Sequence, residues 1–171
     1  MAARSFSERT VEQRLQRLED IASIRYLKHT YAILMDAGLC HENEAWPDAP
    51  FLALFAPDAV WESNVHGRHE GVAALRDLFT GWAARLTFAK HHTIAPSIDV
   101  APSGVEATGH WYTWETITSG GAPIWLAATY NDDFVKRDDG WRIQHIRSNI
   151  QFRAPYHEGW AAEAPLPQMG E

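Results

Sequence analysis

Asp36 and His91 are the two residues whose types and surroundings most readily suggest chemistry. Asp36 follows five apolar residues in YAILMDAG, near the end of a helical stretch that is apolar all round. A carboxylate there meets the negative end of the helix dipole and loses hydration, so a partner must compensate unless the side chain points to water. His91 lies in AKHHTIAPSIDV, and imidazole titrates close to neutral pH. Both side chains are suited to proton transfer.

Period-two alternation predicts that His91 and its neighbour His92 face opposite sides of a strand. On the His91 face, positions 89, 93, 95 and 97 carry small or mildly polar residues that leave room for a ligand. On the His92 face, positions 88, 94, 98 and 100 are larger and apolar, which indicates packing. A structural role for His91 stays open. Because the two histidines face apart and no third ligand follows at suitable spacing, the sequence predicts no metal site.

The signatures of other common chemistries are missing from the sequence. It contains no CxxC pair, no GxGxxG loop and no phosphate-binding P-loop. Cys40 is the single cysteine, so neither an internal disulfide nor a thiolate cluster for zinc or iron–sulfur can form. Proton transfer without a cofactor is therefore the chemistry that the residues favour.

Length, charge and composition narrow the function classes further. A chain of 171 residues fits one domain, and its net charge of −7 disfavours binding to nucleic acid or to an acidic membrane surface. The N-terminal stretch lacks the apolar core of a signal peptide and no apolar run is long enough for a membrane span, so we expect a cytoplasmic protein. Eight tryptophans, five tyrosines and seven phenylalanines suit a pocket for a hydrophobic ligand, or a core or subunit interface.

The first half of the chain is predicted to be mainly helical, and its first helix must position Asp36. Apolar residues recur every three or four positions across residues 10–38, which predicts one long helix with Thr10 and Gly38 as caps. A break near Asp20 is an alternative. Residues 50–57 predict a short helix stopped by Pro57, residues 59–63 a short strand, and residues 71–86 a second strong helix.

Strands account for the second half of the chain. The turn sequences PSG, SGGAP and RDDG separate strands at about 88–100, 105–117, 123–136 and 141–152. Helices followed by hairpin-connected strands predict the α+β class, with helices covering one face of a curved sheet. We expect one domain over residues 1–152 and an irregular, proline-containing extension over residues 153–171.

The order of these segments resembles the SnoaL-like branch of the NTF2-like superfamily across residues 10–152. The resemblance depends on the helix that ends near Asp36, followed by LFAPDAVWE, HEGVAALRDLF, the HH strand, ATGHWYTWE and TYNDDFVKRDDGWRI. It implies a cone, in which a curved antiparallel sheet is closed by N-terminal helices around one deep apolar pocket. Function varies widely on this scaffold.

Within that branch the sequence looks most like cofactor-independent lyases of the dehydrochlorinase, bile-acid 7α-dehydratase and scytalone dehydratase type. In such enzymes an Asp at the end of the first long helix supports a His on the first long strand, which removes a proton while a leaving group departs. The resemblance assigns these roles to Asp36 and His91, and adds Tyr31 as a catalytic hydroxyl. The substrate-binding positions that it implies are Trp61, Trp111, Thr113, Glu115, Tyr130 and Arg147.

The leading expectation is a cofactor-independent, dehydratase-like lyase that uses an Asp–His dyad on a hydrophobic cyclic or aromatic molecule, with water, halide or formaldehyde as leaving group. Thr113 or Glu115 stands where the bile-acid enzyme has a second Asp, so the leaving group stays open. An isomerase or cyclase with the same base, and a noncatalytic binding module, remain alternatives. We expect a homo-oligomer, a trimer as in the lyase relatives or a dimer as in the wider superfamily.

Overall fold

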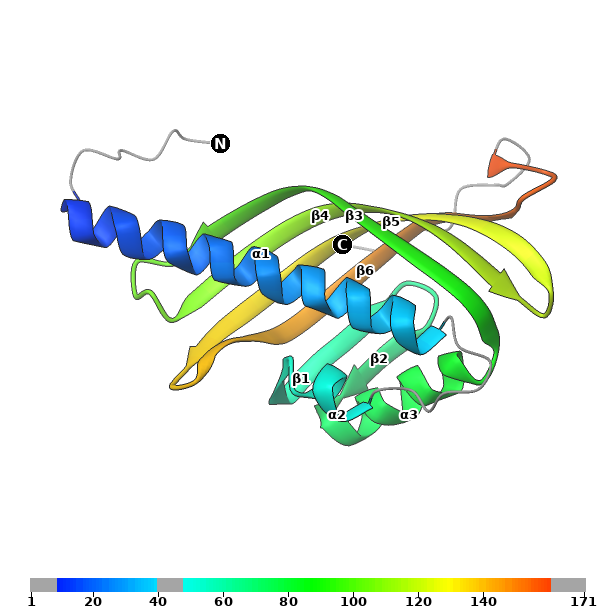
Figure 1. Cartoon of the computed structure of the whole chain (residues 1–171), viewed down its shortest axis with the longest axis horizontal. Coiled ribbons are helices and arrows are strands. Elements are labelled where there is room, and N and C mark those ends of the chain that lie inside the picture. The colour runs from blue at the N-terminus through cyan, green and yellow to red at the C-terminus, as the bar shows by residue number, and fades with distance from the viewer. Residues whose placement is uncertain (1–8, 40–47, 161–171) are drawn as a thin grey trace.

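The computed structural model describes residues 9–39 and 48–160, which form helices packed on a single curved sheet (Figure 1). The helices are α1 (Val11–Leu39), α2 (Asp48–Leu52) and α3 (Gly71–Ala83). The strands are β1 (Phe55–Ser63), β2 (Gly67–Glu70), β3 (Leu86–Val100), β4 (Glu106–Ser119), β5 (Ala122–Arg137) and β6 (Gly140–Pro155).

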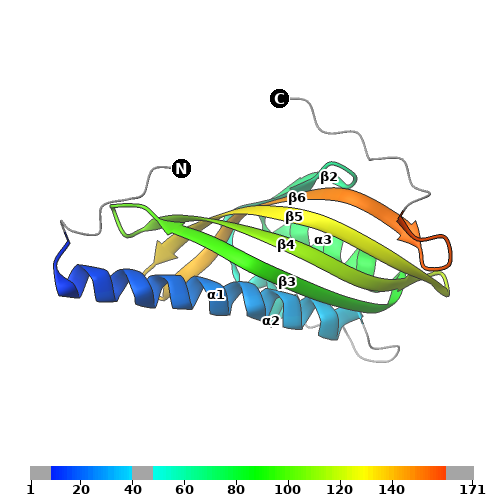
Figure 2. The ribbon, with the colours of Figure 1, turned by 90° about the horizontal axis from the view of Figure 1, so that it is seen from above.

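The strands are ordered β2-β1-β6-β5-β4-β3 in the sheet. Successive hairpins make β3 to β6 antiparallel, whereas β1 runs parallel to β6. Figure 2 shows α1 running alongside β3, while α2 and α3 lie at the end of the molecule formed by β1 and β2 (Figure 1). The predicted α+β class, with helices on a curved and mainly antiparallel sheet, is confirmed.

The N-terminus of α1 has a reciprocal side-chain cap. The backbone N–H of Gln13 donates to Thr10 Oγ1 at 3.2 Å, and the Thr10 N–H donates to the Gln13 side chain at 3.0 Å. At the other end, Gly38 lies inside the helix, which continues to Leu39. Gly38 is therefore not the residue that ends the helix, contrary to the prediction.

α1 is unbroken at Asp20, so the alternative of a break there is wrong. The carboxylate of Asp20 is buried and accepts hydrogen bonds from Lys136 Nζ at 2.7 Å and from Trp141 Nε1 at 3.0 Å. Asp20 thereby joins the helix to β5 and β6, and its polar side chain on an apolar face is explained by these donors.

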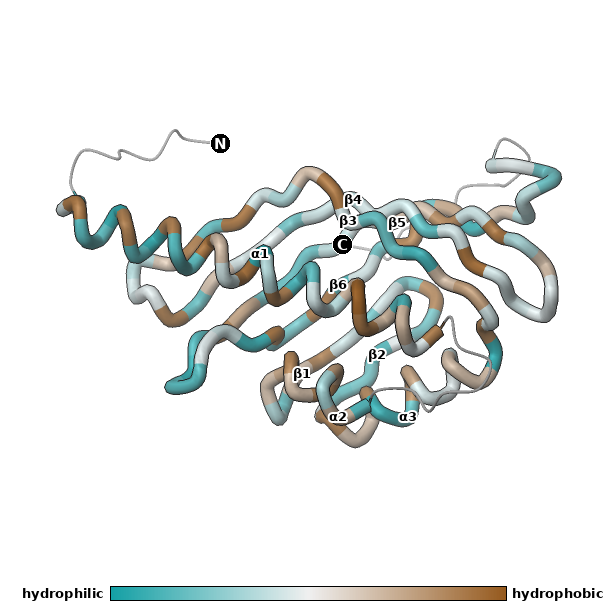
Figure 3. Tube along the Cα trace, in the orientation of Figure 1, coloured by the Kyte–Doolittle hydropathy of each residue, from teal (hydrophilic) through white to brown (hydrophobic). Residues whose placement is uncertain are grey.

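The buried side of α1 supplies much of the core. Ile24, Leu27, Tyr31 and Met35 recur at helical spacing, and each is less than a tenth exposed. Figure 3 shows hydrophobic and hydrophilic residues alternating along this helix. The Tyr31 ring packs on Phe51 with centroids 5.3 Å apart, which joins α1 to α2. In the described parts of the chain, no helix is long and apolar enough to cross a membrane.

The predicted short helix over residues 50–57 is wrong in its second half. α2 ends at Leu52 and β1 already begins at Phe55, so Pro57 lies in a strand. The strand tolerates this proline because the pairing of β1 with β6 is irregular between Phe55 and Val60, where Pro57 interrupts no regular ladder.

Three other boundaries differ from the prediction. β2 was not predicted because its four residues, GRHE, are too short and polar a run to alternate. α3 ends at Ala83, because residues 84 and 85 form a turn and β3 begins at Leu86. β6 continues to Pro155, whereas the last strand was predicted to end at residue 152.

A β-bulge in β3 changes which of its residues face inward. Ile94 pairs with Tyr112 and Ser97 pairs with His110, so β3 has one residue more than β4 between these pairs, and Ala95 has a positive φ of 51°. The bulge reverses the alternation. Before the bulge, the face that His92 shares with positions 88 and 94 is exposed, so the prediction of packing there is wrong. Beyond the bulge, positions 98 and 100 turn inward to the core.

An aromatic cluster lies on the face of the sheet away from α1. The ring of Trp114 has Trp125, Phe152 and Trp160 around it, with centroids 5.4, 5.6 and 5.6 Å away. Trp160 is 54% exposed in the single chain. The expected homo-oligomer stays a prediction.

Candidate active site

The carboxylate of Asp36 lies against the imidazole of His91. Asp36 Oδ1 is 2.7 Å from His91 Nδ1, and it also accepts a hydrogen bond from the His91 backbone N–H at 2.9 Å. The pair forms because the last turn of α1 passes alongside β3. The two side chains are 11% and 7% exposed, so the contact is largely shielded from water.

Asp36 is held in its charged form by a second cation. Lys90 Nζ lies 2.9 Å from Asp36 Oδ2. Burial raises the pKa of the Asp36 carboxyl, but the hydrogen bonds from His91 and Lys90 outweigh burial and leave the pKa below its usual value. These partners compensate for placing a carboxylate at the C-terminal end of a helix.

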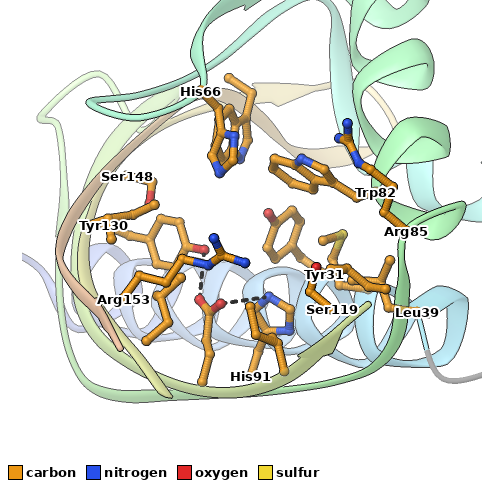
Figure 4. A pocket seen from close by; sticks show the side chains of 17 residues that line it. Tyr31, Leu39, His66, Trp82, Arg85, His91, Ser119, Tyr130, Ser148 and Arg153 are labelled. Atoms are coloured by element: carbon orange, nitrogen blue, oxygen red, sulfur yellow. Dashed lines mark hydrogen bonds and ion pairs between the residues drawn. The ribbon is translucent and has the colours of Figure 1, made fainter. Parts of the chain in front are cut away.

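The other imidazole nitrogen of His91 faces Glu115 on β4. His91 Nε2 lies 3.5 Å from Glu115 Oε2, the contact that the dashed line from His91 marks in Figure 4. The two residues are direct cross-strand partners, which fixes their separation. Burial lowers the pKa of His91, but the negative charge of Glu115 and the hydrogen bond to Asp36 outweigh burial and raise the pKa above its ordinary value.

Glu115 is itself surrounded by hydroxyl groups. Thr113 Oγ1 and the Tyr130 hydroxyl each lie 3.4 Å from Glu115 Oε1, with the hydroxyls as donors. These are long hydrogen bonds. The Glu115 carboxylate can therefore still accept a hydrogen bond from His91 Nε2 when that nitrogen is protonated.

The imidazole opens into a cavity of about 310 Å³ on the concave side of the sheet (Figure 4). This volume lies at the small end of the range for small-molecule sites. The polar residues of the lining are Tyr31, His66, Arg85, His91, Glu115, Ser119, Tyr130, Ser148 and Arg153. Its apolar residues are Met35, Leu39, Trp61, Trp82, Leu86, Ile117, Leu126 and Ile150.

Of the predicted site residues, Tyr31, Trp61, His91, Glu115 and Tyr130 line the cavity, and Asp36 lies behind His91. Figure 4 shows the hydroxyl groups of Tyr31 and Tyr130 pointing into it. Burial raises the pKa of both phenols far above the ordinary value for tyrosine. Both are therefore neutral hydrogen-bond donors over the physiological pH range.

Arg147 does not lie in the cavity, so its predicted place there is wrong. Its guanidinium bonds to Asp133 Oδ2 at 2.8 Å and lies 2.7 Å from His145 Nδ1, on the side of β6 away from the cavity. Ser148, its neighbour in sequence, lines the cavity instead. The prediction placed the arginine one residue out of phase with the strand.

Arg153 is the arginine of β6 that reaches the cavity, and strict alternation from Ser148 would have pointed it outward. Ala128 pairs with Ile150 and Ala127 pairs with Phe152, so Gln151 is an extra residue in β6. This bulge reverses the alternation and turns Arg153 inward. A bulge of this kind leaves no clear mark in the sequence.

Trp111 and Thr113 face the same side of β4 as Glu115 but are not part of the lining, contrary to the prediction. Trp111 is buried against Phe134, with ring centroids 5.8 Å apart. Gly109 makes room for this indole, because a Cβ there would come within 2.1 Å of the Trp111 ring. Trp111 and Thr113 are therefore buried on the inner face of the sheet without lining the cavity.

A buried ion pair was missed from the sequence. Lys28 Nζ lies 2.7 Å from Asp132 Oδ2, and both side chains are at most 1% exposed. The ammonium also lies over the Tyr130 and Tyr31 rings, 3.9 and 4.6 Å from their centroids. Lys28 follows Ile24 by four positions and precedes Tyr31 by three, so a lysine on the apolar side of α1 was a visible signal.

His66, Trp82 and Arg85 also line the cavity and were not predicted to do so. They come from the β1–β2 turn, from α3 and from the segment directly after α3. The sequence predicted residues 71–86 as a helix, but gave no sign that Trp82 or Arg85 would reach a pocket. Within residues 9–39 and 48–160, no group of three His, Cys, Asp or Glu side chains is arranged to hold a metal ion.

A family comparison agrees with this architecture. The model of the SnoaL-like domain matches residues 16–147, which is most of the chain. The chain belongs to the SnoaL-like family. The resemblance inferred from its segments is thereby confirmed, and the helices and the unclosed six-stranded sheet of this SnoaL-like protein fit the NTF2-like cone. No curated protein is similar to the chain in sequence.

Solved structures share the fold of this SnoaL-like protein. A protein described as a candidate scytalone dehydratase, from Novosphingobium aromaticivorans, is 19% identical with a TM-score of 0.73, over 89% of this chain and 95% of that one. The hexachlorocyclohexane dehydrochlorinase LinA-type3 from Novosphingobium barchaimii is 19% identical with a TM-score of 0.72, over 90% and 99%. The protein Rv3472 of Mycobacterium tuberculosis, of unknown function, is 20% identical with a TM-score of 0.68, over 84% and 77%. At these identities the likeness establishes the fold.

Proposed function

We propose that this SnoaL-like protein is a cofactor-independent lyase that eliminates water or another small leaving group from a hydrophobic cyclic or aromatic molecule. The observation that carries the proposal is the 2.7 Å contact between Asp36 Oδ1 and His91 Nδ1 at the wall of the cavity. Dehydrochlorinase and dehydratase names among proteins of the same fold are consistent with it.

The proposed base is His91 Nε2. Asp36 accepts a hydrogen bond from the N–H at Nδ1, which leaves the lone pair on Nε2 free to remove a proton from a substrate carbon. The imidazolium that forms lies between the carboxylates of Asp36 and Glu115, which stabilise it. A positioned general base contributes about 10² to 10⁴ in rate.

Tyr31 is the proposed donor to the leaving group. The electron pair of the broken C–H bond becomes the new C=C bond, and the leaving group departs with the electrons of its own bond. A departing hydroxide takes up the proton that His91 removed and leaves as water, which returns the imidazole to its neutral form, whereas a halide departs as the anion and His91 releases its proton to solvent. A neutral hydroxyl that points into the cavity can donate a hydrogen bond to the departing oxygen or halide. Tyr130, whose hydroxyl is held 3.4 Å from Glu115, is the alternative donor.

The lining favours an apolar ring system as substrate. Two indoles, Trp61 and Trp82, and six aliphatic or thioether side chains surround the cavity. Trp61 and Trp82 meet edge to face with centroids 5.1 Å apart, which gives a firm aromatic wall. A flat or cyclic molecule can bury its surface against these residues while one carbon lies against His91.

The test is a screen of hydroxylated and halogenated cyclic and aromatic compounds, followed by mass spectrometry of the products. Elimination lowers the mass by that of the leaving group, whereas an isomerase or cyclase leaves it unchanged. For a compound that reacts, we expect His91→Gln to lower kcat/KM by about 10² to 10⁴. The matched control is His92→Gln, because His92 is the next residue and is exposed on the opposite face.

Equal activity of the wild type and His91→Gln would exclude His91 as the base. Products of unchanged mass would replace the lyase with an isomerase that uses the same residues. Tight binding of ring compounds without any chemical change across the screen would favour the noncatalytic binding module.

A further inference from the structure

We propose that the cavity contains an anion-binding subsite formed by Arg85 and Arg153, and that the substrate is a hydrophobic ring system carrying a carboxylate or a similar acid group. The acid group would lie at the end of the molecule away from the bond that breaks. The orientation of the substrate rests on the proposed function, whereas the subsite rests on the two arginines alone.

Arg85 and Arg153 reach the cavity from distant parts of the chain. Arg85 follows the C-terminal end of α3, and Arg153 is turned inward by the bulge in β6. Figure 4 shows the guanidinium of Arg153 projecting across the pocket, with Arg85 on the side of α3. His66 lies close to both: burial lowers the pKa of its imidazole, and the positive charges of Arg153 and Arg85 lower it further.

Neither guanidinium has a carboxylate partner among the described residues. Five other arginines in the same residues each form an ion pair with Asp or Glu at 4 Å or less. What sets Arg85 and Arg153 apart from the other arginines of these residues is that both line the cavity and neither has a carboxylate partner there. The planar guanidinium is the side chain best suited to hold a carboxylate through two parallel hydrogen bonds.

The charges of the lining are separated along the cavity. Glu115 and, behind His91, Asp36 place negative charge at the inner end, where an anionic group would be repelled. The arginines place positive charge on the exposed side, since both are exposed residues. Apolar side chains such as Ile117 and Leu126 lie in the same lining. An amphipathic acid is the ligand whose charge and apolar parts match this arrangement.

The experiment compares two probes that differ only in the terminal group, 2-naphthylacetate and 2-(2-naphthyl)ethanol, by isothermal titration calorimetry at low salt. We expect the wild type to bind the acid about tenfold more tightly than the alcohol. Arg153→Gln and Arg85→Gln should each raise the dissociation constant of the acid by about tenfold at most, because both residues are exposed. The dissociation constant of the alcohol should change less than about twofold. Arg137→Gln, an exposed arginine at the end of β5, is the control for net charge.

The subsite is contradicted if the wild type shows no preference for the acid or no measurable binding of it. It is also contradicted if the two arginine variants weaken both probes equally or neither, with folding verified by circular dichroism. His91→Gln separates this inference from the proposed function, because that variant should lose turnover and keep the preference for the acid. A preference for the acid in a protein that catalyses no elimination would leave the subsite standing without the lyase.

Discussion

Replacing Glu115 by Gln should lower the pKa of the His91 imidazole. Gln keeps the shape of the side chain and its contacts with the neighbouring hydroxyls, but it removes the negative charge 3.5 Å from His91 Nε2. The charge of Glu115 is a leading reason why the pKa of His91 lies above its ordinary value despite burial. Without that charge, Asp36 alone opposes the lowering of the His91 pKa by burial.

The size of the effect follows from the distance. Two unit charges 3.5 Å apart interact by about 1 kcal/mol if water screens them fully and by about 5 kcal/mol at an effective dielectric constant near 20. Both side chains are less than a tenth exposed, so the interaction should exceed the fully screened value. The lower figure alone moves a titration midpoint by about one pH unit.

The assay is an NMR titration of the protein with 13C-labelled histidine, which needs no substrate. The chain has nine histidines, and the signal of His91 is identified by its loss in His91→Gln. Glu106→Gln serves as the control, because Glu106 is an exposed carboxylate at the start of the same strand. A wild-type midpoint at or below 6.5, or a midpoint unchanged by Glu115→Gln, would refute the assigned role of Glu115.

Three further predictions address stability and the surroundings of the site. Lys28→Met leaves Asp132 buried without its cation, so the free energy of unfolding measured in urea should fall by about 3 to 5 kcal/mol. The double variant Lys28→Met with Asp132→Leu should regain a large part of this loss, because no buried charge is then left unpaired. Equal losses in the single and double variants would contradict this. Because folding raises the pKa of His91, its protonation stabilises the folded state below about pH 6.5, and this contribution is lost as the pH rises through the folded-state pKa. The free-energy difference between the wild type and His91→Gln should therefore be larger at about pH 5.5 than at about pH 9, and a difference independent of pH would argue against a raised pKa. Arg147→Gln should leave kcat/KM within about twofold of the wild-type value, since Arg147 points away from the cavity. A large loss of kcat/KM would show that Arg147 contributes to the site.

Helix period and strand alternation were sufficient to place Asp36 and His91. Asp36 stood out as a charge in an apolar helix end, and only one of two adjacent strand histidines could face a given pocket. The segment order then indicated the fold, because hydrophobic periodicity reports which side of each element is buried. The contact between the two residues came from the resemblance, since neither pattern measures a distance between elements.

Several of the errors lie where the backbone departs from regular geometry. The bulges near Ala95 and at Gln151 each reverse the alternation, so inward and outward residues beyond them exchange. Arg153 was missed for that reason. The first half of β1 was missed because a proline is not expected inside a strand, so Pro57 was interpreted as the end of a helix. Lys28 was missed because a lysine is normally expected at the surface, and its buried partner lies on a strand more than a hundred positions away.

The central claim is that Asp36 orients and stabilises His91 as a base. The measurement that tests it most directly is kcat/KM of Asp36→Asn on the first compound found to react, with Asp48→Asn as the control, since Asp48 carries an exposed ion pair at the surface. Asn keeps the size of the side chain but carries no charge to hold the imidazolium. We predict a fall of about 10² or more for Asp36→Asn with the fold retained and no change for Asp48→Asn. Full activity of folded Asp36→Asn would contradict the account.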